Sequence, residues 1–389
     1  MSSPRAETGL VLPGGGARAA YQVGVLRAIV RVLPKRASQP FPVICGTSAG
    51  AINAAVLGAN ADSFRRGVAR LLRWWRAIAV TDVYRADLAT LARHGAQLLA
   101  SLGGGGLGPE RATSLLDNAP LKRLLLAGVD TARIHEHIDA GNLHAVAINA
   151  TSYGSGHAVT FYAAAPQVAP WRRVRRRGEP CRFDIDHVMA SAAIPLVFPA
   201  VRLGDDYYMD GSVRQIAPLA PALHLGAARV LVIAVGQFSG QAMTPAAPHY
   251  PSLGQIAGHA LSSVFLDNLG ADLERLYATN RLAAAASAHG HPDARHIDVL
   301  VLAPSADLGA LAVQYAKRLP RGVRYLLRGL GSTRGTGANL LSYLLFDREY
   351  CRALMRLGFA DTMARRDEIV AFLADGTARF TPLFPPEWR

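Results

Sequence analysis

The residues Gly46-Thr47-Ser48-Ala49-Gly50 place a serine where nucleophilic chemistry is possible. They follow a short apolar run, 41–45, and precede an alanine-rich stretch, 51–58, so the pattern predicts a strand, a sharp turn and a helix with Ser48 at the turn. This is the G-x-S-x-G nucleophile elbow, in which small neighbours let the chain turn tightly and expose the hydroxyl. An ordinary serine is a poor nucleophile, so the chemistry also needs a base and an oxyanion hole. On its own, a structural turn explains the pattern equally well.

A run of glycines lies between a predicted strand over 9–12 and a predicted helix over 17–33: Gly14, Gly15 and Gly16. Backbone N–H groups at the start of a helix can bind a phosphate or stabilise the oxyanion of an acyl-transfer intermediate. The run lacks the lysine of a phosphate-binding P-loop and the last glycine of a dinucleotide-binding motif. The next charged residue, Arg18, has three interpretations: it orients the loop, it attracts an anionic headgroup, or it is solvated.

The base has two interpretations. Asp210 ends a predicted strand and precedes Gly211, so its carboxyl lies on a turn, although Asp-Gly alone is most often only a turn. A histidine triad would draw on His224 or His259, which follow Asp210 in the chain, whereas His187 lies in an apolar helix and reads as structural. Alternatively, Asp210 accepts the serine proton directly, which requires a shielded carboxylate within hydrogen-bond distance.

These segments, together with Ala190-Ser191-Ala192-Ala193-Ile194-Pro195, resemble the patatin-like phospholipase family over roughly residues 7–235. Beyond residue 235, the chain has only a general similarity to longer bacterial members of the family. The resemblance implies a three-layer α/β/α fold with a mainly parallel central sheet, and hydrolysis of acyl esters in lipids without a metal or cofactor. It implies that Ser48 and Asp210 form a Ser–Asp dyad and that Gly14, Gly15 and Gly16 form the oxyanion hole. It assigns supporting positions to Arg18, Gly46, Gly50 and Gly211. Two departures from the family pattern are small-for-small: Ala19 and Ser212.

Charge and composition bear on the partners. The chain has 389 residues, 50% of them hydrophobic and 18% charged, which excludes a disordered chain, and its formal net charge is +14. Positive charge favours anionic surfaces, so we expect a phospholipid or other acyl-ester substrate and peripheral membrane contact. The basic run 171–177 has two interpretations: it binds anionic headgroups, or it is a solvated loop. Trp74 and Trp75 also have two interpretations: they form part of a lipid-facing lid, or they are core residues. No signature of specific nucleic-acid binding is present. A non-catalytic lipid-binding protein that retains the fold is the alternative function.

Two regions are predicted: a hydrolase core over 7–240, and a mainly helical region over 241–389 packed on that core. Three scattered cysteines indicate a reducing compartment. No signal-peptide pattern and no apolar run of membrane-spanning length are present, which predicts a cytoplasmic location, peripheral to a membrane. The sequence carries no indication of the oligomeric state. Further helices are predicted over 63–77, 87–102, 185–193, 256–276, 310–317, 338–345, 348–357 and 363–373, further strands over 142–149, 158–162, 229–235 and 297–302, a hairpin over 201–209, and a polar excursion over 164–182.

Overall fold

The computed structural model describes residues 7–34, 39–85, 93, 114–237, 256, 263, 268–288, 296–329 and 338–374. Its strands are β1 (Glu7–Leu12), β2 (Val43–Thr47), β3 (Ala145–Ser152), β4 (Ala158–Ala164), β5 (Trp171–Arg173), β6 (Arg176–Pro180), β7 (Val201–Leu203), β8 (Asp206–Asp210), β9 (Ala227–Ile233) and β10 (Asp298–Leu302). Its α-helices are α1 (Ala20–Val32), α2 (Ala49–Gly58), α3 (Phe64–Ala77), α4 (Val80–Val83), α6 (Ala119–Gly128), α7 (Ala132–Asp139), α8 (Ile185–Ser191), α9 (Ala220–His224), α11 (Asn268–Ala288), α12 (Leu308–Tyr315), α13 (Arg321–Gly329), α14 (Ala338–Leu344), α15 (Arg348–Ala364) and α16 (Arg366–Leu373).

The strands form one mixed sheet whose main path runs β10-β9-β1-β2-β3-β4-β6-β5. The neighbours from β10 to β3 are all parallel, and β3 pairs antiparallel with β4 and with β8. Parallel strands buried on both faces carry continuous apolar runs, as in β9 (AARVLVI), because helices cover both sides of the sheet. The α/β class and the mainly parallel central sheet expected from the sequence are therefore confirmed.

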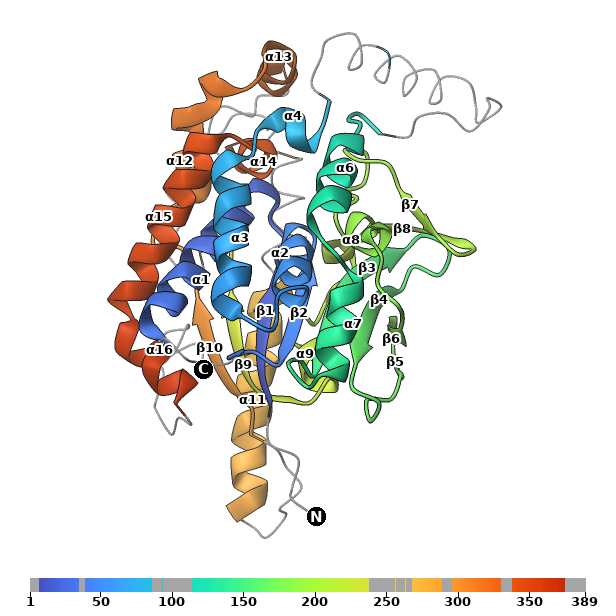
Figure 1. Cartoon of the computed structure of the whole chain (residues 1–389), viewed down its shortest axis with the longest axis vertical. Helices are drawn as coiled ribbons and strands as arrows, with labels where there is room; N and C mark the ends of the chain where they lie inside the picture. Colours follow the sequence, from blue (N-terminus) through green and yellow to red (C-terminus); the bar gives the residue numbers. More distant parts are fainter. Residues whose placement is uncertain are drawn as a thin grey trace.

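Alternate residues of the central strands supply two separate cores. Leu10 and Leu12 of β1 belong to the core beneath α1, α2 and α3, which lie over the sheet in Figure 1. Val11, between them, belongs to the core on the other face, which includes Leu269 and Leu273 of α11. Successive side chains of a strand point to opposite faces, so a single strand serves both cores. The result is a helix–sheet–helix layering.

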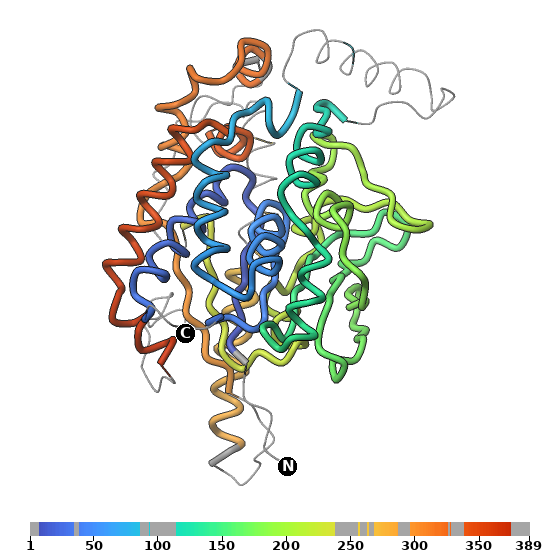
Figure 2. Tube along the Cα trace, viewed as in Figure 1, coloured from blue at the N-terminus to red at the C-terminus, as the bar shows by residue number. Residues whose placement is uncertain are grey.

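The helix α15 packs along α1, as the traces of Figure 2 show. The contact is close at two glycines: a Cβ on Gly24 would lie 2.2 Å from the Met355 carbonyl oxygen, and one on Gly358 would lie 2.3 Å from that of Tyr21. Such distances are too short for any side chain, so each glycine lets one backbone approach the other. The C-terminal helices are thus in direct contact with the first helix of the chain. The division near residue 240 stays a prediction, because that residue lies outside the described part.

One sequence expectation is wrong in part. The polar excursion over 164–182 contains a short hairpin, β5 and β6, whose strand β6 also pairs with β4, so the sheet extends through an arginine-rich segment. The helices α4, α6, α7, α9 and α13 had no counterpart in the sequence prediction. The predicted helix over 87–102, apart from Arg93, and most of the predicted helix over 256–276 before Asn268 lie outside the described residues. In the described part of the chain, no helix has both the length and the hydropathy to cross a bilayer.

Candidate active site

Ser48 occupies a strained turn between β2 and α2. Its backbone has φ 56° and ψ −128°, a conformation that L residues rarely adopt and that the surrounding structure must hold in place. The neighbouring glycines are required by close packing. A Cβ on Gly50 would lie 2.0 Å from the Leu12 carbonyl oxygen, and one on Gly46 would lie 2.5 Å from the Gly50 carbonyl oxygen. The elbow predicted from the sequence is therefore present, pressed against the end of β1.

The sheet register brings Asp210 to the same place. Strand β2 ends with Thr47 opposite Asn149 of β3. Strand β8 joins β3 antiparallel, with Asp210 opposite Ala150, the next residue along. The other edge of β3 is occupied by β4, so β2 and β8 meet end to end along one edge. Ser48 directly follows β2, and the Ser48 side chain lies close to the carboxyl of Asp210.

Burial dominates the electrostatics of Asp210. The residue is 1% exposed, and desolvation raises the pKa of its carboxyl from 3.8 to about 6. The Ser48 hydroxyl opposes this shift, as does the Ser212 backbone N–H, which donates to Oδ1 at 2.9 Å. Oδ2 has no partner that meets hydrogen-bond geometry, although the Ser48 hydroxyl is near enough to affect the pKa. One carboxylate oxygen is therefore held by the backbone and the other is left without a fixed donor.

Ser191, to which the sequence interpretation gave no role, supports the backbone of the turn at Ser48. The hydroxyl of Ser191 accepts a hydrogen bond from the Ser48 backbone N–H at 2.8 Å and donates to the Asn149 carbonyl at 2.6 Å. The carbonyl of Ala193 accepts the Asp210 N–H at 2.9 Å. The segment around α8 therefore fixes the backbone at both Ser48 and Asp210. The only sequence signal for this was the motif of residues 190–195.

The glycine loop lies buried beside the elbow. Gly16 has φ 53°, and a Cβ there would lie 2.2 Å from the Tyr343 carbonyl oxygen, so only glycine fits. Gly16 lines the same pocket as Ser48, whereas Gly14 lines a neighbouring recess with Ser212, and Gly15 packs against Val235. Among the described residues, the three glycine N–H groups find no hydrogen-bond acceptor. They remain free to donate to a ligand.

Arg18 is neither solvated nor free to bind a headgroup. It is 2% exposed, its Nε donates to Ser342 Oγ at 2.7 Å, and its Nη2 donates to Asn339 Oδ1 at 2.8 Å. Its guanidinium also lies 4.3 Å from the centroid of the Tyr343 ring, a cation–π contact. Of the three interpretations, the structure supports the first: Arg18 orients the glycine loop by tying it to α14.

A chain of buried amides holds the other side of the loop. Gln22 Nε2 donates to the Pro13 carbonyl at 2.9 Å, and Asn53 Nδ2 donates to Gln22 Oε1 at 2.9 Å. The indole N–H of Trp75 completes the chain by donating to Asn53 Oδ1 at 2.9 Å. Buried polar groups whose hydrogen bonds are satisfied make the backbone rigid. The loop, the elbow helix and α3 therefore form one fixed unit.

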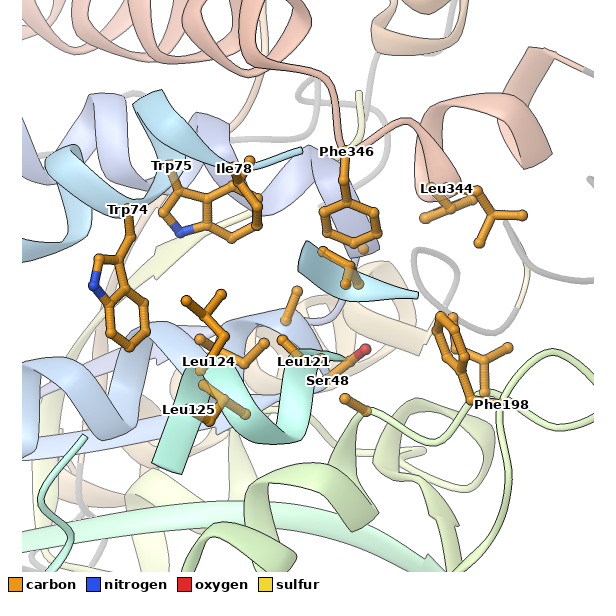
Figure 3. Close-up of a pocket in the computed structure, with 17 residues that line it drawn as sticks. Ser48, Trp74, Trp75, Ile78, Leu121, Leu124, Leu125, Phe198, Leu344 and Phe346 are labelled. Atoms are coloured by element: carbon orange, nitrogen blue, oxygen red, sulfur yellow. The ribbon is translucent and has the colours of Figure 1, made fainter. Parts of the chain in front are cut away.

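Ser48 opens into an apolar chamber of about 640 Å³, a volume that includes the solvent at its mouth (Figure 3). The wall beside α3 is formed by Trp74 and Trp75, the latter only 3% exposed, which favours their role as packed chamber residues. The remaining lining residues are Gly16, Ala49, Ile52, Ile78, Val83, Leu121, Leu124, Leu125, Ala192, Ile194, Phe198, Tyr343, Leu344 and Phe346. A chamber with this apolar lining suits a hydrocarbon chain.

None of the described histidines lines this chamber. His224 stacks on Trp171 in a different recess, with ring centroids 4.8 Å apart. His187 belongs to the N-terminal cap of α8, where its ring contacts Asp184 at 2.8 Å, which agrees with a structural role. His259 lies outside the described residues. The described part of the chain also contains no cluster of side chains suited to hold a metal ion.

Comparison with known proteins places part of the chain in a family. A family model described as patatin-like phospholipase matches residues 10–223. No curated protein matches the chain. Among solved structures, the chain is similar to human GIVD cytosolic phospholipase A2 in complex with methyl gamma-linolenyl fluorophosphonate, at 13% sequence identity and a TM-score of 0.45. The alignment covers 95% of this chain but 59% of that structure, so the chain spans less than two thirds of its length. The chamber residues Tyr343, Leu344 and Phe346 lie beyond the segment that matches the family model.

Proposed function

The chain belongs to the patatin-like phospholipase family, and we propose that it is a carboxylic ester hydrolase of phospholipase A or lysophospholipase type that uses a Ser48–Asp210 dyad. One observation carries the proposal: the Ser48 hydroxyl lines an apolar chamber and lies beside the buried carboxyl of Asp210. A nucleophile, a base and a site for an acyl chain are then adjacent. No described histidine lines the chamber to serve as an alternative base.

In the first half of the reaction, Ser48 Oγ attacks the ester carbonyl carbon while its proton passes to Asp210. With a pKa of about 6, the carboxyl is mostly ionised near neutral pH and is a stronger base than an exposed aspartate. The C–O bond to the alcohol then breaks, and Asp210 returns the proton to the leaving oxygen. An acyl-serine and a free alcohol result.

The charge on the tetrahedral oxygen needs donors, and we assign them to the glycine loop. The N–H groups of Gly14, Gly15 and Gly16 lack acceptors, and Gly16 lies in the pocket with Ser48. Preorganised donors of this kind contribute about 3–4 kcal/mol each to transition-state stabilisation. In the second half, Asp210 takes a proton from water, the resulting nucleophile attacks the acyl-serine, and Ser48 Oγ leaves with the proton to regenerate the enzyme.

The chamber supports an ester of a fatty acid as the substrate class. Its lining is almost wholly aliphatic and aromatic, so it favours the acyl chain over the polar headgroup. Two hydrophobic side chains on the segments that form the chamber are exposed: Leu126 at 61% and Leu196 at 65%. Exposed apolar residues next to a lipid-binding cavity support peripheral contact with a membrane surface.

Replacing Ser48 by alanine tests the dyad. We expect Ser48→Ala to lose turnover of p-nitrophenyl acyl esters and labelling by a fluorophosphonate probe, with an unchanged melting temperature. Ser155→Ala, on the exposed loop between β3 and β4, is the matched control and should retain both. Turnover in folded Ser48→Ala at the wild-type rate would refute the proposal. If the folded wild-type protein neither turns over esters nor reacts with the probe, the chain is instead a non-catalytic lipid-binding protein that retains the fold.

A further inference from the structure

A second recess lies beside the arginine-rich hairpin. Five of its lining residues carry the argument: Trp171 and Arg173 of β5, Arg176 of β6, Gln215, and His224 of α9. It encloses about 360 Å³, solvent at its mouth included. Trp171 packs against the core under α9 and α11, whereas the chamber residues of Ser48 belong to the core on the other face. We propose that this recess binds a phosphate group, held by the guanidinium groups of Arg173 and Arg176.

Strand alternation selects which arginines face the recess. In β5, Trp171 and Arg173 project to one face and Arg172 projects to the other. In β6, Arg176 projects to the recess, while Arg177 bonds Glu179 and Ser155 away from it. The indole of Trp171 covers the face of Gly178, where any Cβ would lie 2.3 Å from the ring. The hairpin therefore separates its arginines into a set inside the recess and a set outside it.

Neither of the two inner arginines forms an ion pair with a described residue, and Nε of Arg176 is buried without a hydrogen-bond partner. A buried guanidinium donor without an acceptor costs free energy, which a bound anion would relieve. Arg176 acts electrostatically on the carboxyl of Asp272, favouring its ionised form, but Oδ2 of Asp272 already accepts the Leu219 N–H at 2.9 Å.

The remaining wall supplies neutral donors. Burial, together with Arg173 and Arg176, lowers the pKa of His224, so its ring is neutral near pH 7 and contributes an N–H without adding charge. Gln215 uses its Oε1 to accept the Thr47 hydroxyl at 2.8 Å, which leaves its amide nitrogen for a ligand. Two guanidinium groups with neutral donors around them suit the oxygens of a phosphate, because guanidinium binds phosphate in bidentate fashion.

The recess is linked to the elbow through side chains of the sheet. Thr160 donates to Asn149 Oδ1 at 2.7 Å, and Asn149 Nδ2 donates to Thr47 Oγ1 at 3.1 Å, one residue before Ser48. Asn149, Thr160 and Gln215 all line the recess. A phosphate bound there would lie against the same hydrogen-bond network that supports the end of β2.

Calorimetric titration of the full chain with inorganic phosphate tests the proposal. We expect saturable binding by the wild type, at least about tenfold weaker binding by Arg176→Gln, and affinity within about twofold of the wild type for Arg172→Gln. The latter variant removes the same charge from the outer face of the same hairpin. If Arg176→Gln has a lowered melting temperature, Arg173→Gln replaces it. Equal affinity in the inner and outer variants, or no saturable binding by the wild type, would overturn the proposal.

A sedimentation arm identifies the source of the phosphate. Phosphatidylcholine vesicles with and without phosphatidic acid present the group as a lipid headgroup. If Arg176→Gln loses binding to the phosphatidic acid vesicles and Arg172→Gln keeps it, the occupant is a headgroup. If both variants bind these vesicles equally while only Arg176→Gln loses inorganic phosphate, the occupant is a soluble phosphate. Both arms measure binding without turnover, so they are independent of the proposed esterase activity.

Discussion

Replacing Asp210 by asparagine should inactivate the protein and stabilise it at the same time. Asparagine keeps an oxygen to accept the Ser212 N–H, but it cannot take a proton from Ser48. General-base catalysis contributes typically 10²–10⁴-fold, so we expect ester turnover to fall by about that factor. In the wild type, turnover should decline as the pH falls below about 6, because protonation removes the base.

The gain in stability follows from the raised pKa. Between 3.8 and about 6, the folded protein binds a proton at Asp210 that the unfolded chain has lost, so the contribution of this residue to stability falls as the pH rises. The destabilisation caused by the ionised Asp210 carboxyl reaches its full size above about pH 6. A shift of about 2 pH units at 1.36 kcal/mol each corresponds to about 3 kcal/mol at most. Asparagine does not ionise and therefore avoids this cost.

Urea unfolding of the wild type and Asp210→Asn between pH 4 and pH 8 measures the effect. The advantage of the variant should be near zero at pH 4, should grow through pH 6, and should be constant above about pH 7. Asp205→Asn is the matched control, because that side chain on the β7–β8 turn is fully exposed, and it should give no comparable pH-dependent difference. A stability difference independent of pH would refute the assignment of Asp210 as a buried ionisable base.

Two further substitutions test the packing of the site. Gly50→Ala places a Cβ 2.0 Å from the Leu12 carbonyl oxygen and should lower the free energy of unfolding by more than about 3 kcal/mol. Gly141→Ala, at φ 73° with open space around it, should lower the free energy of unfolding by about 1–2 kcal/mol. Equal melting temperatures of the two variants would contradict the close contact at Gly50. Leu124→Trp partly fills the chamber and should reduce turnover of p-nitrophenyl palmitate by about tenfold while leaving that of the butyrate ester; equal losses on both would contradict the chamber as the acyl site.

The elbow and the glycine loop could be predicted because each is contiguous in sequence. Five residues specify the turn at Ser48, and the run of glycines marks a place where the backbone approaches a neighbour. The proximity of Ser48 and Asp210 could not be predicted in this way. It requires β8 to pair with β3 directly beyond the residues of β3 that pair with β2. The sequence alone left a histidine base open, and composition cannot decide which strand occupies an edge.

The role of Arg18 was also undecided by sequence. A lone arginine after a glycine loop is compatible with solvent, with an anionic ligand and with a structural contact. The choice depends on Ser342, which lies 324 residues further along the chain and reaches the guanidinium only when α14 packs on the loop. The arginine hairpin is a similar case: alternation into and out of the recess exists only once β5 and β6 pair.

The sequence by itself determined the α/β class and the sharp turn at Ser48, because apolar periodicity and small residues at a turn act over a few neighbouring positions. Tertiary structure alone decided which carboxyl lies beside Ser48, how far its pKa rises, and that Tyr343, Leu344 and Phe346 line the apolar chamber. These properties depend on burial and on contacts between segments distant in the chain. Burial and these long-range contacts arise only when the sheet and the C-terminal helices pack together.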